Sequence, residues 1–333
     1  MSVEGGPILE AAQDAYLAFR IIWETNMKPG NAVDPGEYTL SPPTVHVLPP
    51  ADISAKIKVD LAALSHQGKV RENNEDHFLI TRIERSLETI KTNLPRGAIP
   101  QRFAEVGYGM LVADGMGGRQ AGEIASQLAI STFVNLVLHT PDWIMRLGKP
   151  EADQVMERMA KRYRIVDATM RGKAQTDPTL AGMGTTMTLA CSVGPILVLA
   201  HIGDSRVYLF RAGQCHQLTR DQTQAQSLVD LGILQPEEAA GHYLKHALTG
   251  VLGTGQSLGE AEVHQLTLAD KDQILLCTDG LTDMVQQPMI AAILGDSKTS
   301  DEACQRLVDA ALDKGGKDNV TVVLARYRLP LVT

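Results

Sequence analysis

The sequence contains a series of short apolar runs with the length and residue types of β-strands, and several of them follow one another directly. Residues 57–61 alternate apolar and polar side chains, as a half-buried strand requires. Strands that come in consecutive groups, without strict alternation with helices, pair mostly antiparallel. The runs lie at residues 57–61, 77–83, 106–113, 185–193, 196–202, 207–211, 274–278 and 319–328.

Three longer segments have the apolar spacing of helices, at residues 120–139, 153–170 and 300–313. This order of elements predicts an α+β fold, a four-layer α-β-β-α sandwich in which two largely antiparallel sheets lie between outer helices. Residues 84–105, which include Pro95 and Pro100, are expected to form an exposed insertion between two strands.

The first part of the chain has a different pattern. In residues 8–26 apolar side chains recur at spacings of three and four, which predicts an amphipathic helix. Six prolines follow between Pro29 and Pro50, and such a tract forms neither a regular helix nor a sheet ladder. We therefore expect a helix and a proline-rich linker in residues 1–53 and the main domain in residues 54–330. A surface arm packed on that domain is the alternative to a regulatory or docking role.

The charge balance and the cysteines restrict the class of function. With 39 acidic and 31 basic residues the net charge is −8, which argues against nucleic acid as a partner and suits a metal site better. The cysteines form no CxxC pair, so we expect buried thiols without a disulfide framework or a thiolate metal cluster. They are Cys191, Cys215, Cys277 and Cys304.

Two further features concern location. The N-terminal residues lack the basic and apolar pattern of a signal peptide, so we expect a cytoplasmic protein. Residues 178–203 contain no Asp, Glu, Lys or Arg over a length that could span a membrane, but they contain several Thr and Gly residues and a Gly194-Pro195 pair. Two buried strands joined by a turn explain the segment better, and no membrane span is expected.

Carboxylates stand at the ends of several predicted strands. Asp114 and Asp279 each end an apolar run, whereas Glu75, Asp76 and Asp318 each precede one. Carboxylates gathered at a sheet edge would repel one another, and Mg²⁺ or Mn²⁺, which prefer oxygen ligands, would remove that repulsion. The Asp-Gly pair is also common in ordinary turns, and spacing alone does not show that these residues converge.

Six motifs occur in order along the chain: VRENNED, ADGMGG, GMGTT, HIGDSR, LLCTDGLTD and KDNVTVV. In this order they resemble the successive motifs of the metal-dependent protein phosphatases, the PPM or type 2C Ser/Thr phosphatase family, in its bacterial form. The resemblance extends over about residues 55–329. It implies a β-sandwich flanked by helices, with a dinuclear Mn²⁺ or Mg²⁺ centre in a cleft at one end.

The resemblance also implies roles for individual residues. Asp114 matches the carboxylate that bridges both ions, and the carbonyl of Gly115 matches a ligand of one of them. Asp279 and Asp318 resemble ligands of one ion, and Glu75 resembles a ligand of the other.

Asp76 resembles the residue that orders metal-bound water, and Arg71 matches the arginine that binds the substrate phosphoryl group. A guanidinium suits this task because it can donate two hydrogen bonds to one phosphate. In sites of this kind two ions about 3.5–4 Å apart activate a shared water, which attacks phosphorus without a covalent enzyme intermediate. Arg71, Asp76 and Asp114 are therefore the expected catalytic residues.

Other phosphate chemistries lack their motifs here. The pattern C-x5-R of thiol phosphatases is absent, since Cys215 and Arg220 are one residue too close. The Walker pattern G-x4-GK[ST] is also absent.

Two positions bear on finer points of the resemblance. Met116 stands where some relatives carry a histidine, so the general acid is left unassigned. Ala181 stands before GMGTT where the family pattern usually has an aspartate that helps to hold a third ion. Because alanine cannot ligate a metal, we expect a third site to be weak or empty, although Asp283 remains and Asp177 lies close in sequence.

His201 and Asp204 in HIGDSR invite a catalytic interpretation. We expect structural roles, because polar residues that close a strand often satisfy backbone groups at a tight turn. Residues 221–255, with a predicted helix at residues 236–240, correspond to the variable flap beside the cleft. That segment is expected either to influence substrate choice or to form a passive surface loop.

The leading functional hypothesis is a phosphoserine/phosphothreonine protein phosphatase. Its expected partners are phosphorylated proteins, among them a Ser/Thr kinase and the substrates of that kinase. Two alternatives remain, namely a non-catalytic binding or signalling module on the same fold and an enzyme that acts on small phosphate esters.

Overall fold

The computed structural model describes residues 53–117, 121–139, 149–254 and 261–330. The chain divides into a unit of residues 1–49 and a unit of residues 50–333. Every described residue belongs to the second unit, and the second unit alone is described below. The predicted amphipathic helix at residues 8–26 and the proline-rich linker lie outside the described residues.

One sheet has five strands in the order β1-β11-β10-β7-β8, and every pair in it is antiparallel. β11, which comes late in the chain, lies between the early strand β1 and β10. The strands of this sheet are β1 (Lys58–His66), β7 (Arg206–Arg211), β8 (Gln214–Gln217), β10 (Gln273–Cys277) and β11 (Val320–Arg328).

The other sheet has six strands, in the order β2-β3-β5-β6-β9, with the short strand β4 paired to β3. Its pairs are also antiparallel. The strands are β2 (Asp76–Glu88), β3 (Arg102–Met116), β4 (Gly184–Thr185), β5 (Met187–Val193), β6 (Ile196–Ile202) and β9 (Glu262–Thr267).

The long uncharged segment forms the centre of this sheet. Residues 187–193 and 196–202 are the paired strands β5 and β6, which confirms two strands joined by a turn. The turn contains Gly194 with φ +58°, a backbone conformation that glycine adopts without steric cost.

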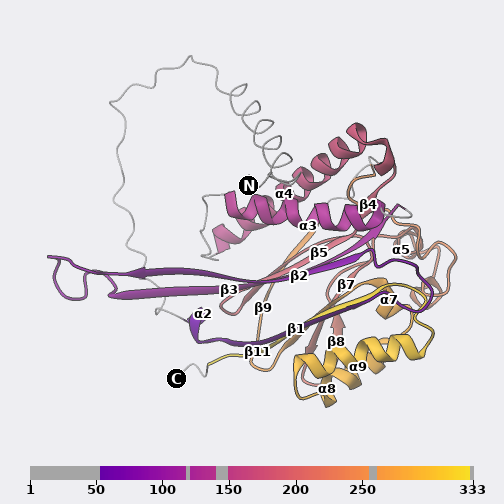
Figure 1. Ribbon diagram of the computed structural model, residues 1–333. Coiled ribbons are helices and arrows are strands. Elements are labelled where there is room, and N and C mark those ends of the chain that lie inside the picture. Colours follow the sequence, from indigo (N-terminus) through magenta and orange to yellow (C-terminus); the bar gives the residue numbers. More distant parts are fainter. Residues whose placement is uncertain (1–52, 118–120, 140–148, 255–260, 331–333) are drawn as a thin grey trace, which may run out of the picture. The chain divides into compact units, whose positions relative to one another are not determined.

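Helices cover the outer faces of both sheets (Figure 1). α3 (Ala121–His139) and α4 (Lys149–Thr176) lie on the six-stranded sheet, and α8 (Gln287–Asp296) and α9 (Ser300–Asp313) lie on the five-stranded sheet. The shorter helices are α2 (Ile53–Lys56), η1 (Pro178–Leu180), α5 (Gln224–Asp230), α6 (Pro236–Ala239) and α7 (Asp279–Thr282).

Three apolar clusters hold the four layers together. The middle cluster joins the two sheets through buried side chains such as Met110, Leu276 and Val323, and an outer cluster lies under the helices of each sheet. Tyr163 of α4 is buried and donates its hydroxyl to the carbonyl oxygens of Ala200 and Met187, at 2.8 and 3.2 Å. A buried tyrosine hydroxyl usually has such a partner, and here it connects α4 to β5 and β6.

Among the described helices, α3 alone has the length and apolar composition of a membrane span. Its buried side chains, which include Ala125, Ala129 and Phe133, pack in the cluster under the six-stranded sheet. This packing is that of a core helix in a folded domain.

The predicted fold class, an α+β sandwich of two antiparallel sheets between helices, is confirmed. The helix predicted at residues 300–313 is α9, with the same bounds. The strands β8 and β9 and the helices α5 and α8 were not predicted. β9 is a half-exposed edge strand with the sequence EVHQLT, so it lacks a continuous apolar run.

The expected insertion at residues 84–105 needs a correction, because the residues at both of its ends belong to strands. β2 continues to Glu88 and β3 begins at Arg102, and the two pair along their whole length, so the loop comprises residues 89–101 alone. Cross-strand contacts extend the pairing: Arg102 and Glu88 form an ion pair of 2.8 Å, and the Arg85 guanidinium lies 5.6 Å from the centre of the Phe103 ring.

Candidate active site

Two carboxylates face each other at one end of the six-stranded sheet. Asp76 is the first residue of β2, and the register of β2 and β3 places it directly opposite Asp114. Residues opposite each other in an antiparallel pair project from the same face, about 5 Å apart. The pairing of β2 and β3 is therefore enough to bring these two acids together.

Burial and mutual repulsion raise the pKa of both carboxyl groups. Asp76 is 5% exposed, and its pKa rises to about 7, first because of burial and then because of the nearby charges of Asp279 and Asp318. The pKa of Asp114 also lies well above its ordinary value, through burial and then the charge of Asp76. Both acids would ionise more readily beside a cation.

The five-stranded sheet contributes two more acids at the same end. Asp279 opens α7, directly after β10, and Asp318 lies two residues before β11. β10 and β11 are antiparallel neighbours, so the end of one strand and the start of the other share a sheet edge. The two sheets thus bring four carboxylates, far apart in sequence, to one end of the sandwich.

One side chain ties the ends of the sheets together. The hydroxyl of Thr278 donates to Oδ2 of Asp76 at 2.8 Å and accepts from the backbone N–H of Thr321 at 3.0 Å. The Thr278 side chain is fully buried. This hydrogen bond favours the ionised form of Asp76 and fixes one of its oxygens.

The threonines of GMGTT fix the backbone of Asp114 on its other side. The Thr186 hydroxyl accepts from the Asp114 N–H at 3.0 Å, and the Thr185 hydroxyl donates to the Asp114 carbonyl at 2.8 Å. Asp114 is therefore held from both neighbouring strands.

At this end of the sandwich two buried carboxylate oxygens have no hydrogen-bond partner among the described residues, namely Oδ1 of Asp76 and Oδ1 of Asp279. A buried acceptor without a partner is costly, and most such atoms in proteins are satisfied. The nearby carboxylates and backbone carbonyls offer the oxygen ligands that a hard divalent cation such as Mn²⁺ or Mg²⁺ prefers, so such an ion fits the site.

Close backbone approach at this site requires glycine. A Cβ on Gly115 would lie 2.0 Å from the Gly122 carbonyl oxygen and 2.8 Å from that of Glu75. A Cβ on Gly122, at the start of α3, would lie 2.6 Å from the carboxylate of Glu75. The two glycines therefore allow α3 to begin directly against Glu75.

Glu75 is positioned mainly through its backbone. Its N–H donates to Oδ1 of Asn319 at 2.8 Å, and its carbonyl accepts from the Ser126 hydroxyl at 2.6 Å. Burial raises the pKa of its carboxyl group. The positive end of the α3 dipole lies close by and favours the ionised form.

Arg71 lies at the rim of the cleft. Its Nη2 contacts Oδ2 of Asp318 at 2.7 Å, and its side chain is 54% exposed. The hydrogen bond to Asp318 raises the pKa of the guanidinium, which stays charged. The predicted site residues that line this one cleft are Arg71, Glu75, Asp114, Gly115, Asp279, Asp283 and Asp318, with Asp76 buried nearby.

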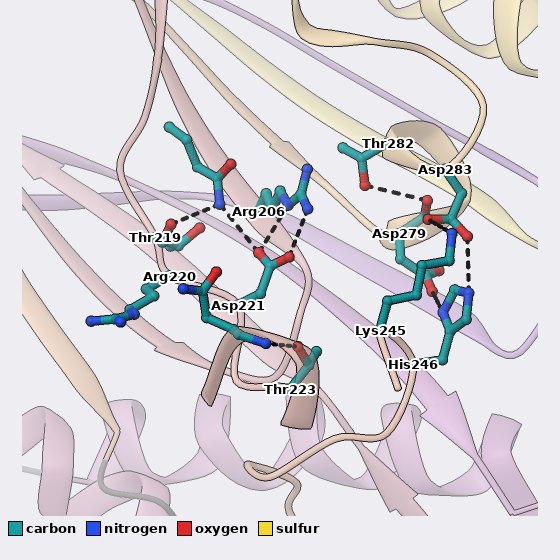
Figure 2. A network of polar contacts seen from close by, with 12 residues as sticks. Arg206, Thr219, Arg220, Asp221, Thr223, Lys245, His246, Asp279, Thr282 and Asp283 are labelled. Carbon is teal, nitrogen blue, oxygen red and sulfur yellow. Dashed lines mark hydrogen bonds and ion pairs between the residues drawn. The ribbon is translucent and has the colours of Figure 1, made fainter. Parts of the chain in front are cut away.

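Lys245 and His246 also reach this cleft; residues 221–255 were expected beside it, but neither residue was singled out as a site residue. Figure 2 shows both side chains turned toward Asp279 and Asp283. Lys245 Nζ lies 3.1 Å from Oδ1 of Asp283, and the two ring nitrogens of His246 lie 3.4 Å from Asp279 and 3.3 Å from Asp283. The hydrogen bond to Asp279 raises the pKa of His246.

Asp204 is a further acid at this end of the sandwich. It is 8% exposed, and burial together with the charges of Asp279 and Asp221 holds its pKa well above the ordinary value. Carboxylate and imidazole atoms of Asp204, His246 and Asp279 lie within 4.8 Å of one another. Beside them Arg206 forms a bidentate pair with Asp221, at 2.6 and 2.8 Å (Figure 2).

His201 has both ring nitrogens engaged away from the cleft. The Nδ1 atom contacts the Thr188 hydroxyl at 2.8 Å, and Nε2 contacts the Arg220 carbonyl at 3.2 Å. The ring is fully buried, and burial lowers its pKa. A neutral histidine held by two hydrogen bonds links β5, β6 and the segment after β8.

Ala181 ends the short helix η1 and is exposed, with no oxygen in its side chain. The nearby Asp177 accepts hydrogen bonds from the backbone and hydroxyl of Thr179, at 3.1 and 2.6 Å. Asp177 thus caps η1. Met116 lines the cleft.

The four cysteines carry free thiols, and none forms a disulfide among the described residues. Burial raises the pKa of Cys191 and Cys215 to about 11 and that of Cys277 and Cys304 to about 12. Thiols with such pKa values are poor nucleophiles at neutral pH.

Comparisons with known proteins agree with this geometry. A family model described as protein phosphatase 2C matches residues 102–314. The serine/threonine protein phosphatase PstP of Mycobacterium tuberculosis is 36% identical over 264 residues, which is 79% of this chain and 44% of PstP. This chain therefore spans less than half the length of that relative.

In two further comparisons this chain covers most of the length of the other protein or domain. The serine/threonine phosphatase Stp of Listeria innocua is 32% identical over 220 residues, 66% of this chain and 84% of Stp. A crystal structure of the catalytic domain of PstP in complex with two manganese ions superposes with a TM-score of 0.63 and 33% identity. It covers 82% of this chain and 99% of that domain.

Proposed function

This chain belongs to the protein phosphatase 2C family, and on that premise we propose that it is a metal-dependent phosphatase of phosphoserine and phosphothreonine in proteins. The observation that carries the proposal is the pairing of Asp76 with Asp114, in which a buried carboxylate oxygen has no partner among the described residues. The two manganese ions in the PstP catalytic domain support a dinuclear site.

In this proposal Asp114, Asp279, Asp318 and Glu75, with the carbonyl of Gly115, hold two Mn²⁺ or Mg²⁺ ions. When bound, such ions lower the pKa of water and stabilise negative charge on phosphoryl oxygens. The reaction converts a phosphate monoester and water into an alcohol and inorganic phosphate.

The protein's own groups bind and orient the reactants. Arg71 at the rim binds the phosphoryl group through its guanidinium N–H donors. Asp76, fixed by the Thr278 hydroxyl, accepts hydrogen bonds from water in the site and so orients it.

For the third ion we propose a weak or empty site. Asp283 faces Lys245 and His246, and Ala181 offers no ligand. Anomalous scattering from crystals soaked in increasing Mn²⁺ tests this, and full occupancy of a third ion next to Asp283 would contradict it.

The proposed partners are phosphorylated proteins, including those modified by a Ser/Thr kinase, met in the cytoplasm. Hydrolysis of a phosphothreonine peptide, compared with a small ester such as p-nitrophenyl phosphate, separates a protein phosphatase from an enzyme of small esters.

The test of the proposed activity uses the full chain with Mn²⁺. Asp279→Asn and Asp114→Asn should abolish phosphopeptide hydrolysis and weaken manganese uptake in calorimetry, whereas the exposed Asp313→Asn on α9 should change neither. If the native chain binds manganese and phosphopeptide but shows no turnover, the non-catalytic binding module replaces this proposal.

A further inference from the structure

β2 and β3 continue as a two-stranded ribbon beyond the rest of the six-stranded sheet (Figure 1). β5 pairs with β3 over residues 107–112, while the β2–β3 pairing continues to Glu88 and Arg102. Within the described residues no third strand pairs with β3 in this outer part. The loop at residues 89–101 is thus presented at the end of a projecting ribbon.

Large aliphatic side chains are exposed on this loop and at the end of the strand before it. Ile90 is 85% exposed, Leu87 51%, Leu94 50% and Ile99 36%. Single exposed aliphatic residues are common on protein surfaces. Several within one short projecting segment indicate a surface that contacts a membrane or a partner protein.

The charge of the loop is opposite to that of the chain. Residues 89–101 contain Lys91 and Arg96 and no acidic residue, a charge of +2. The whole chain carries −8, so the remainder carries −8 − 2 = −10. Both cations are exposed, and neither forms an ion pair among the described residues.

The backbone of the loop is partly satisfied from within. The Thr89 N–H donates to the Gln101 carbonyl at 2.9 Å, and the Ala98 N–H donates to the Pro95 carbonyl at 3.0 Å. Pro95 and Pro100 have no N–H to leave unpaired. These features lower the cost of moving the loop into a medium with few hydrogen-bond partners.

We propose that this ribbon tip is a membrane-docking element that inserts Ile90 and Leu94 shallowly into a bilayer containing anionic lipid, with Lys91 and Arg96 at the headgroups. Peripheral membrane binding gains free energy in two ways: apolar side chains are buried at the headgroup boundary, and basic residues beside them attract anionic lipid. A bilayer takes convex apolar side chains without a matching groove, and its anionic headgroups complement the two cations of the loop.

The docked orientation leaves the cleft open. Asp76 and Glu88 are the two ends of β2, separated by twelve residues or about 40 Å of strand. Docking at the tip would therefore hold the enzyme at a membrane with its cleft remote from the lipid, where membrane-associated phosphoproteins could reach it.

Vesicle flotation of the full-length chain tests the proposal. Binding to phosphatidylcholine vesicles should require added phosphatidylserine and should weaken as salt shortens the Debye length. The double variant Lys91→Glu with Arg96→Glu should lower binding by roughly 30-fold or more, since each cation contributes about a factor of five. Ile90→Gln with Leu94→Gln should lower it at least about tenfold.

Two matched control variants carry substitutions of the same kinds at exposed positions outside the ribbon tip. Leu231→Gln with Ile233→Gln removes two aliphatic side chains that are 72% and 68% exposed, and Lys298→Glu with Lys314→Glu makes the same change of net charge. Both controls should bind vesicles as the native chain does.

Two results would overturn the proposal. One is absence of binding to anionic vesicles, and the other is undiminished binding by both tip variants, which would assign docking to another part of the chain. If vesicles are not bound but sedimentation shows a dimer that the tip variants dissociate, the tip is an interface between copies of this chain. Hydrolysis of p-nitrophenyl phosphate by the tip variants should match the native rate, which keeps this test separate from that of the proposed function.

Discussion

Thr278 donates its hydroxyl hydrogen to Oδ2 of Asp76 at 2.8 Å, across 202 residues of sequence and from one sheet to the other. The hydroxyl oxygen of Thr278 in turn accepts the N–H of Thr321. The buried hydroxyl of Thr278 thus connects the two sheets and also holds the carboxylate of Asp76 in place.

Replacing Thr278 by valine should therefore affect both stability and metal binding. The variant keeps the side-chain shape but removes the acceptor of the Thr321 N–H and one hydrogen bond to Asp76, at a cost of about 1–3 kcal/mol in the free energy of unfolding. Manganese affinity should fall because Asp76 loses a hydrogen bond that favours its ionised form. Thr278→Ser restores the hydroxyl, and equal urea midpoints and calorimetric affinities for the two variants would rule out this role.

The raised pKa values predict how pH affects the protein after its metal is removed with a chelator. Asp76 has an ordinary pKa of 3.8 and a folded-state pKa of about 7, and the pKa of Asp114 is raised as well. At pH values between the unfolded and the folded pKa of Asp76, the folded protein retains a proton that the unfolded chain has released. Stability should therefore be greatest at the acidic end of this window and decrease by a few kcal/mol as pH rises from about 4 to about 7.

Manganese should reverse this trend, because the bound ion replaces the protons. Calorimetry near pH 6 in buffers of different ionisation enthalpy should show proton release on binding. Asp76→Asn, which cannot ionise, should make the stability profile of the metal-free protein less steep, with the part due to Asp114 remaining. A profile that rises with pH across this window would show that the folded acids are not protonated.

Two glycines in helices provide a matched comparison. A Cβ at Gly122 would lie 2.6 Å from the Glu75 carboxylate, whereas a Cβ at Gly172 in α4 has nothing within 4 Å. Gly172→Ala should raise the free energy of unfolding by up to about 1 kcal/mol through helix propensity, without any effect on metal binding. Gly122→Ala should displace Glu75 and weaken manganese binding roughly 10- to 100-fold. Equal manganese affinities would show that Glu75 tolerates the displacement.

Sequence reasoning reached the parts of the site that local patterns encode. Asp114 and Asp279 each follow an apolar run and precede glycine, and β10 ends within one residue of the predicted run, although β3 continues past Asp114 to Met116. The bounds of α9 were predictable because Thr299 caps it and an apolar face repeats along it. These features depend on neighbours within a few residues.

Contacts made by tertiary folding were not predictable in this way. Lys245 meets Asp283 across 38 residues, and His246 lies in a loop without any apolar period, so no spacing rule links them to the acids. The full length of β2 and β3 was missed because their outer parts, exposed in β2 and mostly half-buried in β3, show no burial alternation. Cross-strand pairs, which the sequence does not reveal without the register, stabilise them instead.

Arg71 offers a test that separates ligand binding from stability. Its ion pair with Asp318 is 2.7 Å long, but the arginine is 54% exposed, so the pair contributes less than about 1 kcal/mol to folding. Arg71→Ala should leave the urea midpoint close to native, yet raise KM for a phosphothreonine peptide and the inhibition constant of inorganic phosphate by roughly 10- to 100-fold. Arg71→Lys should recover little of this, because an ammonium lacks the planar pair of donors. Arg328→Ala, at an exposed position on β11, is the matched control and should change neither constant. Native phosphate inhibition in Arg71→Ala, with native manganese binding, would show that the guanidinium does not contact the phosphoryl group.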